Sequence, residues 1–110
     1  MSMYKILLAC GAGCSSGLVA QRMRKYAKRN NIEAQIRAVG DAEIINCVED
    51  YDILMLGPHL QYELPKITAS IQAKGLTTII RLITKEQYAA LDGESVLKDV
   101  VRVLDEATEI

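Results

Sequence analysis

The residues best suited to chemistry in this 110-residue chain are Cys10 and the small residues that follow it, Gly11, Ala12, Gly13, Cys14, Ser15 and Ser16. Glycines let backbone N–H groups turn toward a common centre, and a helix start adds unpaired donors and the positive end of its dipole. Such a loop suits an anion, most often phosphate. A thiol at its first position is favoured as thiolate. We therefore predict that Cys10 is a nucleophile that carries a group, with an inert buried cysteine as the alternative.

Phosphoryl transfer fits this loop, because the reaction needs an in-line nucleophile and donors to three equatorial oxygens more than acid–base groups. The backbone amides of residues 11–16 can supply those donors. The hydroxyls of Ser15 and Ser16 either add to them or cap the following helix. His59 either touches the phosphate or a partner, or is a surface residue. Tyr62 and Tyr88 are expected to pack.

Alternating strand and helix patterns must position these groups, and they predict an α/β fold. The predicted strands are 4–9, 32–39, 52–57 and 76–83. The predicted helices are 16–30, a short one over 42–47, one from about 62 to 73, a turn or short helix at 84–91, and a last helix opening at 92–94. Right-handed crossovers give an open parallel four-stranded sheet, order 2-1-3-4, with helices on both faces. Cys10 then lies at the switch point.

Composition narrows the class of protein. The length suits one domain over residues 1–110, and the absence of Phe and Trp leaves Ile, Leu, Val, Ala and Met to form the core. A formal net charge of −1 offers no polycation for nucleic acid. No apolar run approaches the ~20 residues that span a bilayer. Three cysteines without a signal peptide indicate reduced cytoplasmic thiols, with Cys47 an ordinary buried one.

A basic run occupies the helix predicted over 16–30. It comprises Arg22, Arg24, Lys25, Lys28 and Arg29. Such a run is either a solvated face, with the late cations favoured by the helix dipole, or a docking surface for an acidic partner near the loop.

Three motifs in order carry a resemblance that covers nearly the whole chain. They are Ala9-Cys10-Gly11-Ala12-Gly13-Cys14-Ser15-Ser16, then Leu56-Gly57-Pro58-His59, then Tyr88-Ala89-Ala90-Leu91-Asp92-Gly93-Glu94. The chain resembles the cytoplasmic IIB components of the bacterial phosphoenolpyruvate-dependent sugar phosphotransferase system, of the lactose/cellobiose/chitobiose class. It departs from them at Cys14, where Met is common, and at His59, where Gln is common.

The resemblance implies that Cys10 accepts a phosphoryl group from a phosphohistidine on a IIA component and passes it to a sugar held by a membrane-embedded IIC component. The expected protein is cytoplasmic and meets the membrane through IIC. From the charge and the cysteine spacing we expect no nucleic-acid partner and no metal, and we expect no cofactor. A relay protein with transient partners is expected to be a monomer. An apolar rim should dock on IIA, with Leu18, Leu60 and Tyr62 as contacts and Arg22 or Arg24 as steering charges.

Other readings of the same residues stay open. Low-molecular-weight tyrosine phosphatases and related arsenate reductases use a similar loop with Cys-x-x-x-x-x-Arg, but Ser16 stands at the arginine position. A metal-binding module could use Cys10, Cys14, Cys47 and His59, although their spacing is unlike that of zinc sites. A non-catalytic anion-binding domain differs from a phosphotransferase in that Cys10 never becomes phosphorylated.

Overall fold

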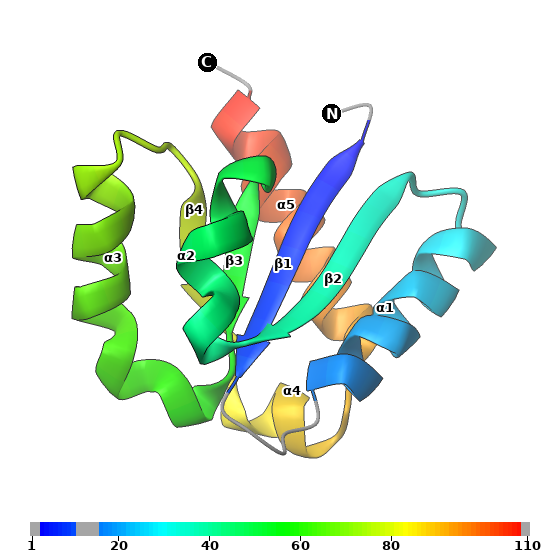
Figure 1. Ribbon diagram of the computed structural model, residues 1–110. Helices are drawn as coiled ribbons and strands as arrows, with labels where there is room; N and C mark the ends of the chain where they lie inside the picture. Colours follow the sequence, from blue (N-terminus) through cyan, green and yellow to red (C-terminus); the bar gives the residue numbers. More distant parts are fainter. Residues whose placement is uncertain (1–2, 11–15, 109–110) are drawn as a thin grey trace.

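The computed structural model describes residues 3–10 and 16–108, and within them the chain forms one four-stranded parallel sheet (Figure 1). The strands are β1 (Tyr4–Cys10), β2 (Ala34–Gly40), β3 (Ile53–Leu56) and β4 (Ile79–Leu82). Their order is β2-β1-β3-β4, which confirms the predicted 2-1-3-4 topology. Because all strands run the same way, their carboxyl ends meet at one edge of the sheet.

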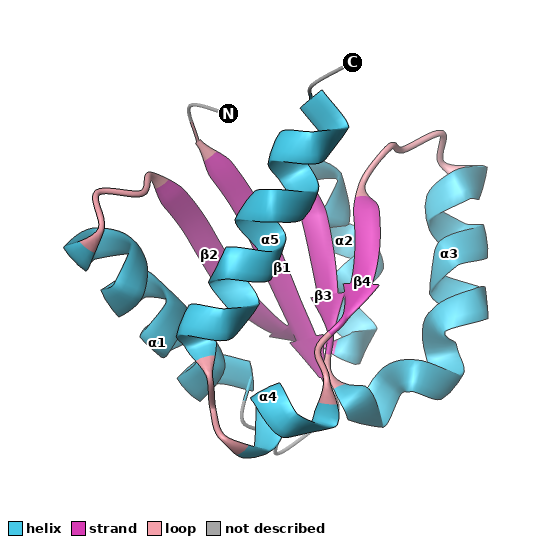
Figure 2. Cartoon of the chain, turned by 180° about the vertical axis from the view of Figure 1, so that it is seen from behind, coloured by secondary structure: helices cyan, strands magenta, loops and turns pink. Residues whose placement is uncertain are grey.

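Helices cover both faces of the sheet, as predicted. The helices α1 (Ser16–Arg29) and α5 (Gly93–Thr108) lie on one face, which Figure 2 shows from the front. The short α2 (Ile44–Cys47) and α3 (Leu64–Ala73) lie on the other, nearer the viewer in Figure 1. The five-residue α4 (Lys85–Ala89) lies at the carboxyl edge, close to the end of β1 in both views.

The central strand β1 is buried on both faces, which explains its unbroken apolar run. Successive side chains of a strand point to opposite faces. Ile6 and Leu8 accordingly join the core beneath α1 and α5, whereas Leu7 and Ala9 join the core beneath α2 and α3. Strands buried on both faces are typical of parallel sheets covered by helices. The main chain of β1 is therefore held rigidly up to its last residue.

Several predicted boundaries differ from the structure by one to three residues, and two of these differences have a clear physical reason. The predicted strand over 76–83 is shorter, because the amide of Leu76 donates to the Ile71 carbonyl (3.2 Å) and closes the end of α3 instead of joining the sheet. Gly75 allows this turn with a φ of 70°. Before α3, residues Pro58–Glu63 form a 3-10 helix, so the α-helix starts at Leu64 and Pro65 lies in its first turn as predicted.

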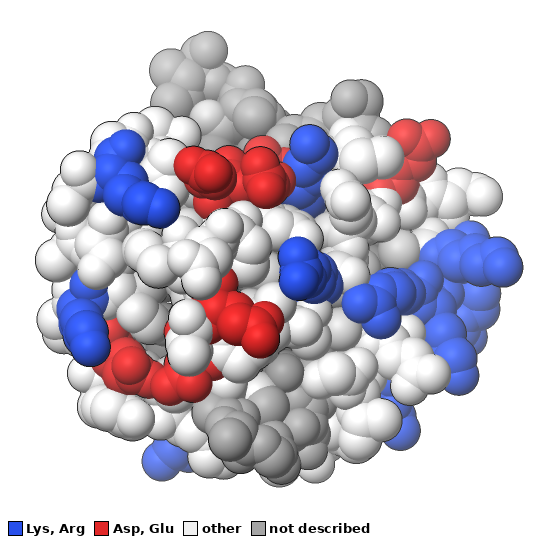
Figure 3. Space-filling view, viewed as in Figure 1, with Lys and Arg blue, Asp and Glu red and all other residues white. Residues whose placement is uncertain are grey.

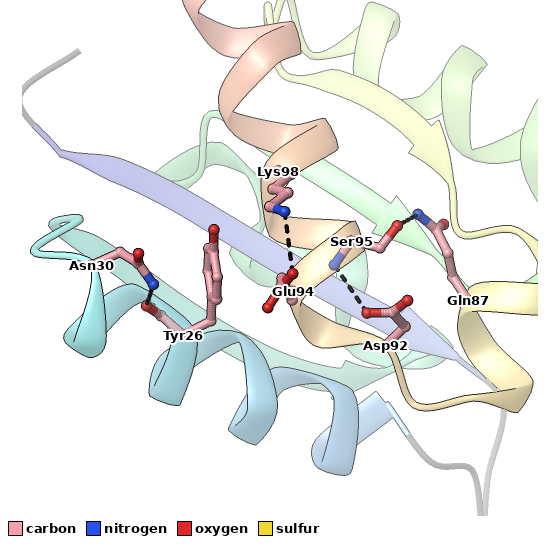
Figure 4. A network of polar contacts seen from close by, with 7 residues as sticks. All are labelled: Tyr26, Asn30, Gln87, Asp92, Glu94, Ser95 and Lys98. Atoms are coloured by element: carbon pink, nitrogen blue, oxygen red, sulfur yellow. Dashed lines mark hydrogen bonds and ion pairs between the residues drawn. The ribbon is translucent and has the colours of Figure 1, made fainter.

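The short α4 is fixed to α5 by a buried amide, Gln87. Thr84 and Gln87 form a capping box, in which each main-chain amide donates to the other side chain at 3.0 Å. The Gln87 Nε2 then donates to Ser95 and to Asp99, both at 2.8 Å. Figure 4 shows the Gln87–Ser95 contact beside the α5 N-terminus. This network sets the direction in which α4 presents its next residue, Tyr88.

Candidate active site

Cys10 is the last residue of the central strand and lies fully buried at the carboxyl edge of the sheet. Its neighbour in β2 is Gly40, and on the other side the amide of Gly57 donates to the carbonyl of Ala9 at 2.8 Å. The chain crosses from β1 to β2 on one side and then to β3 on the other, so Cys10 occupies the predicted switch point. Ligands of open parallel sheets bind at such points.

Two glycines flank Cys10 on the neighbouring strands. A Cβ built on Gly57 would lie 3.1 Å from the Cβ of Cys10, closer than the ~3.5–4.0 Å of ordinary carbon contacts. A Cβ on Gly40 would meet nothing within 4 Å. Both backbones are extended, with φ of −62° and −76°. Glycine is therefore needed at position 57 to leave room for the side chain of Cys10, and not because the backbone there adopts an unusual conformation.

Tyr88 lies on the same side of the site as Gly57. Its Cε1 would be 3.7 Å from a Cβ on Gly57, and its ring meets the ring of His59 edge-on, with centroids 5.0 Å apart and an interplanar angle of 71°. Tyr88 is half-buried and His59 is exposed. The structure thus brings the two later motifs together beside Cys10. The expectation that Tyr88 packs is confirmed, but its packing partners are groups of the site.

The exposed residues near this edge form what we call the site rim: Leu18, His59 and Tyr62. Leu18 in the first turn of α1 is 50% exposed. Tyr62 is 77% exposed, so the expectation that Tyr62 packs is wrong. Leu60 is only 2% exposed, so its prediction as a docking contact is wrong. The reason is the 3-10 helix over Pro58–Glu63, which turns Leu60 into the core under α3 while Tyr62 faces out.

The phosphate-loop residues Gly11, Ala12, Gly13, Cys14 and Ser15 lie outside the described residues. Ser16 begins α1, which fixes where the loop must end. The loop therefore joins the end of a buried strand to the N-terminus of a 14-residue helix, the connection that the sequence predicted.

Two cysteines are described, and they differ. Cys10 is fully buried at the end of β1. Cys47 is a free, half-buried thiol that donates to the carbonyls of Glu43 (3.3 Å) and Ile44 (3.8 Å). Burial raises the pKa of the Cys47 thiol above 9.0, and the charge of Arg37 offsets part of that rise. Cys47 is thus a weak nucleophile on a structural helix.

The arginines nearest to the loop in sequence are engaged elsewhere. The guanidinium of Arg24 donates twice to the carbonyl of Ile36 in β2, through Nε at 3.0 Å and Nη2 at 2.6 Å. Arg22 lines a groove between α1 and the start of α5. Neither takes the place of the bidentate arginine that a cysteine phosphatase uses on its phosphate oxygens.

The described residues contain neither a cluster of metal-ligand side chains nor a membrane-spanning helix. Among residues 3–10 and 16–108, no three His, Cys, Asp or Glu side chains are grouped as metal ligands would be. No helix in that part of the chain has the length and apolar character needed to cross a membrane.

Comparison with known proteins adds the family. Residues 5–99 match the family model described as PTS system, Lactose/Cellobiose specific IIB subunit. The chain belongs to this IIB family. A relative in Bacillus subtilis, the PTS system oligo-beta-mannoside-specific EIIB component, is 29% identical over 105 residues, which cover 93% of this chain and 97% of that protein. The galactose-specific EIIB component of Lactococcus lactis is 29% identical over 97 residues, covering 84% and 88% of the two chains.

Solved structures agree with the family. The cellobiose-specific IIB component of Borrelia burgdorferi superposes with a TM-score of 0.76 at 31% identity, covering 94% of each chain. The lactose-specific IIB domain of Streptococcus pneumoniae shares the fold, with a TM-score of 0.75 at 17% identity over 94% of this chain and 96% of that one. This IIB protein is therefore a phosphotransferase-system component of the lactose/cellobiose type, a family that takes part in phosphoryl transfer during sugar uptake with IIA and IIC partners.

Two glycine contacts in this IIB protein could not be predicted from the sequence. Gly57 is the last residue of the strand predicted over 52–57, and its contact with Cys10 depends on how β3 lies beside β1. Gly93 was read as part of a helix start, yet a Cβ there would lie 2.6 Å from the Met23 nitrogen in α1. In both cases the only clue in the sequence was a glycine at a position where no turn or positive φ requires one.

Proposed function

We propose that Cys10 is the residue that carries the phosphoryl group in this protein, accepting it from a phosphohistidine on a IIA component and passing it to a sugar held by a IIC component. The observation that supports this most is the position of Cys10, buried at the end of the central strand, at the switch point and next to the start of α1. Within the described residues, no other cysteine shares that position.

The chemistry balances in two displacements. In the first, the Cys10 thiolate attacks phosphorus, the sulfur–phosphorus bond forms, the nitrogen–phosphorus bond breaks, and the histidine leaves with its electron pair. In the second, a sugar hydroxyl oxygen attacks the same phosphorus, loses its proton, and returns the thiolate. We propose that the amides of residues 11–16 hold the equatorial oxygens in both steps.

The rim residues are proposed to act on partners. Leu18 and Tyr62 offer exposed apolar surface beside the site, which can dock on IIA and exclude water from the transfer. His59 offers an exposed imidazole held by Tyr88, in position for a phosphate or partner contact. We further propose that the protein acts as a monomer, that residues 1–110 form one IIB domain, and that transfer occurs in the cytoplasm against membrane-embedded IIC.

The sugar is proposed to be an oligosaccharide of the cellobiose, chitobiose or lactose type. The related proteins are named for oligo-beta-mannoside, galactose and cellobiose, so the class is shared and the individual sugar differs. Since IIC holds the sugar, a panel of these sugars offered to the complete system identifies it. The phosphatase reading is disfavoured, because Arg24 is bound to Ile36 and Arg22 faces another groove.

The test is intact mass spectrometry of the reduced protein after incubation with phosphoenolpyruvate, the general phosphotransfer proteins and the IIA component of the same organism. We expect a gain of one phosphoryl group, lost in Cys10→Ser and kept in the matched controls Cys47→Ser and Cys14→Ser. A phosphoryl group that survives Cys10→Ser and maps to His59 would refute the assignment.

Hydrolysis separates relay from phosphatase. The isolated phospho-form should decay slowly in water and the protein should turn over aryl phosphates poorly. Among the described residues, Arg24 is bound to Ile36 and Arg22 lines another groove, so neither can act as the bidentate arginine of a phosphatase. Turnover of an aryl phosphate that disappears in Cys10→Ser would instead establish the phosphatase.

A further inference from the structure

One feature of α1 is not used by the proposed chemistry: a line of residues at spacings of four, three and four, Leu18, Arg22, Lys25 and Arg29. At 3.6 residues per turn these residues stack along a single side of the helix. We call the three cations the basic stripe. All three are exposed, and Figure 3 shows Lys and Arg side chains gathered at the right, over α1. The stripe begins one turn from Leu18 in the site rim.

The basic stripe forms one wall of a groove of about 490 Å³ between α1 and the start of α5. The opposite wall carries Asp92 and Glu94. Gly93 lies between them against the backbone of α1, where a Cβ would be 2.7 Å from the Arg22 Cβ, so the two helices touch at the base of the groove. The groove's lining from α5 is the start of that helix, which follows α4 at the carboxyl edge of the sheet, the same edge as Cys10.

The carboxylates of the groove are already partnered, whereas the cations of the stripe are not. Asp92 accepts from the Ser95 amide at 3.1 Å and caps α5, and Glu94 pairs with Lys98 at 3.1 Å (Figure 4). The ion pairs recorded between described residues include none of Arg22, Lys25 or Arg29. Three like charges on one helix side repel one another when nothing opposes them.

The helix dipole explains only part of this arrangement. Lys28 and Arg29 lie in the last turn of α1, where cations are favoured. Arg22 and Lys25 lie in the middle of the helix, where the dipole gives them no such advantage. The helix dipole therefore does not explain Arg22 and Lys25, and a negatively charged ligand bound in the groove would explain both.

From these observations we infer that the groove docks an acidic segment of the protein that phosphorylates Cys10, with two or three carboxylates facing the basic stripe. This inference rests on the proposed relay function. The stripe from Arg22 to Arg29 spans ~10 Å at 1.5 Å per residue, the length of two turns of a partner helix. Such contacts steer encounter and set orientation. The exposed Leu18 continues the surface to the rim, so one partner can cover both.

A flat anionic membrane fits the groove less well. The stripe is one wall of a concave surface, and the carboxylates of Asp92 and Glu94 on the other wall repel lipid phosphates. A protein segment can present carboxylates to the basic stripe and neutral or hydrogen-bond-donating groups to the wall that carries Asp92 and Glu94. The same two carboxylates disfavour a nucleic acid backbone.

The test measures association of the IIA component from the same organism with the Cys10→Ser protein, which separates binding from transfer. The variant is Arg22→Glu/Lys25→Glu/Arg29→Glu. Its matched control is Lys5→Glu/Lys28→Glu/Arg37→Glu, which reverses three exposed cations outside the groove and gives the same net charge. At low salt we expect the stripe variant to associate about tenfold or more slowly and the control to change far less. If the triple glutamate variants do not fold, the same positions are changed to glutamine and the measurement is repeated.

Each outcome is decisive. Equal losses in both triple variants would mean nonspecific attraction, and an unchanged stripe variant would remove the docking groove; either overturns the inference. Loss of binding to phosphatidylglycerol vesicles with unchanged IIA association would overturn it in favour of a membrane contact. Failure of Cys10 to become phosphorylated, with IIA association still dependent on the stripe, would refute the proposed function but would still support the groove as the surface that docks IIA.

Discussion

Replacement of Gly57 by alanine is the sharpest test of how the fold holds Cys10. The added methyl carbon would lie 3.1 Å from the Cys10 Cβ, against ~3.5–4.0 Å for an ordinary carbon contact. The backbone at Gly57 and the Cys10 side chain must therefore move apart by roughly 0.4–0.9 Å. The Gly57 amide is hydrogen-bonded to Ala9 at 2.8 Å, which holds the two strands together. We therefore expect the end of β1, and with it the sulfur, to be displaced.

The expected effect on rate is larger than the effect on stability. A misplacement of about 1 Å in a reacting group can reduce rate about 10²-fold, so a shift of half that size predicts roughly a tenfold loss. Overpacking lowers the free energy of unfolding by about 1–3 kcal/mol. The loss of glycine also raises the free energy of unfolding by about 0.4–1 kcal/mol, because alanine restricts the unfolded chain and its side chain is compatible with the extended backbone at position 57.

Gly40→Ala is the matched control. Gly40 flanks Cys10 on the other side with an equally extended backbone, but its added methyl group meets nothing within 4 Å. We expect unchanged transfer and a free energy of unfolding higher by up to about 1 kcal/mol.

Three measurements cover both variants: the rate of phosphorylation by IIA, the alkylation rate of the reduced Cys10 thiol without a partner, and urea unfolding. Alkylation reports on the thiol alone, so it separates displacement of the sulfur from a clash with IIA. If Gly57→Ala matched Gly40→Ala in both rates within about twofold, the proposed spatial role of Gly57 would be wrong.

Three further predictions concern the surrounding structure. Gly93→Ala should lower the free energy of unfolding by about 1–3 kcal/mol or more, because its methyl group would lie 2.6 Å from the backbone nitrogen of Met23. Gln87→Ala should lower it by about 1–3 kcal/mol, because a buried amide with partners at both ends is lost. The Tyr4 hydroxyl donates to Asp105 at 2.8 Å, and this bond, with burial, raises the pKa of Tyr4 above 10.0. Its stabilisation is complete below pH 10.0 and is lost as the pH rises through the raised folded-state pKa, so Tyr4→Phe should remove that alkaline loss.

Urea unfolding measures all three, and the controls are simple. Gln72→Ala changes an exposed glutamine on α3 and should stay within about 0.5 kcal/mol. A Gly93→Ala protein as stable as the native one would show that α1 and α5 separate easily at that point. Identical alkaline unfolding curves for Tyr4→Phe and the native protein would contradict the assigned role of the Asp105 hydrogen bond.

The sequence by itself determined the class of fold and placed Cys10, the proposed nucleophile, at the end of the first strand. Both are local: the apolar run through Ile6, Leu7 and Leu8 can only be a strand buried on both faces, and small residues after Cys10 lead directly into an amphipathic helix. Parallel strands with right-handed crossovers then leave few orders of the sheet. The order β2-β1-β3-β4 and the helices on both faces follow from these rules, and the structure confirms them.

The tertiary structure decided which residues far apart in the chain contact one another. Leu60 and Tyr62 are two residues apart, and only the 3-10 turn after Pro58 directs one inward and the other outward. Arg22 and Arg24 look alike in sequence, yet one is bound to Ile36 and the other lines a groove. Gly57 and Gly40 have similar backbones, and only the packing of β3 against Cys10 distinguishes them. The physical reason is common to all three pairs: periodicity specifies the face of an element, whereas a contact depends on how two elements meet.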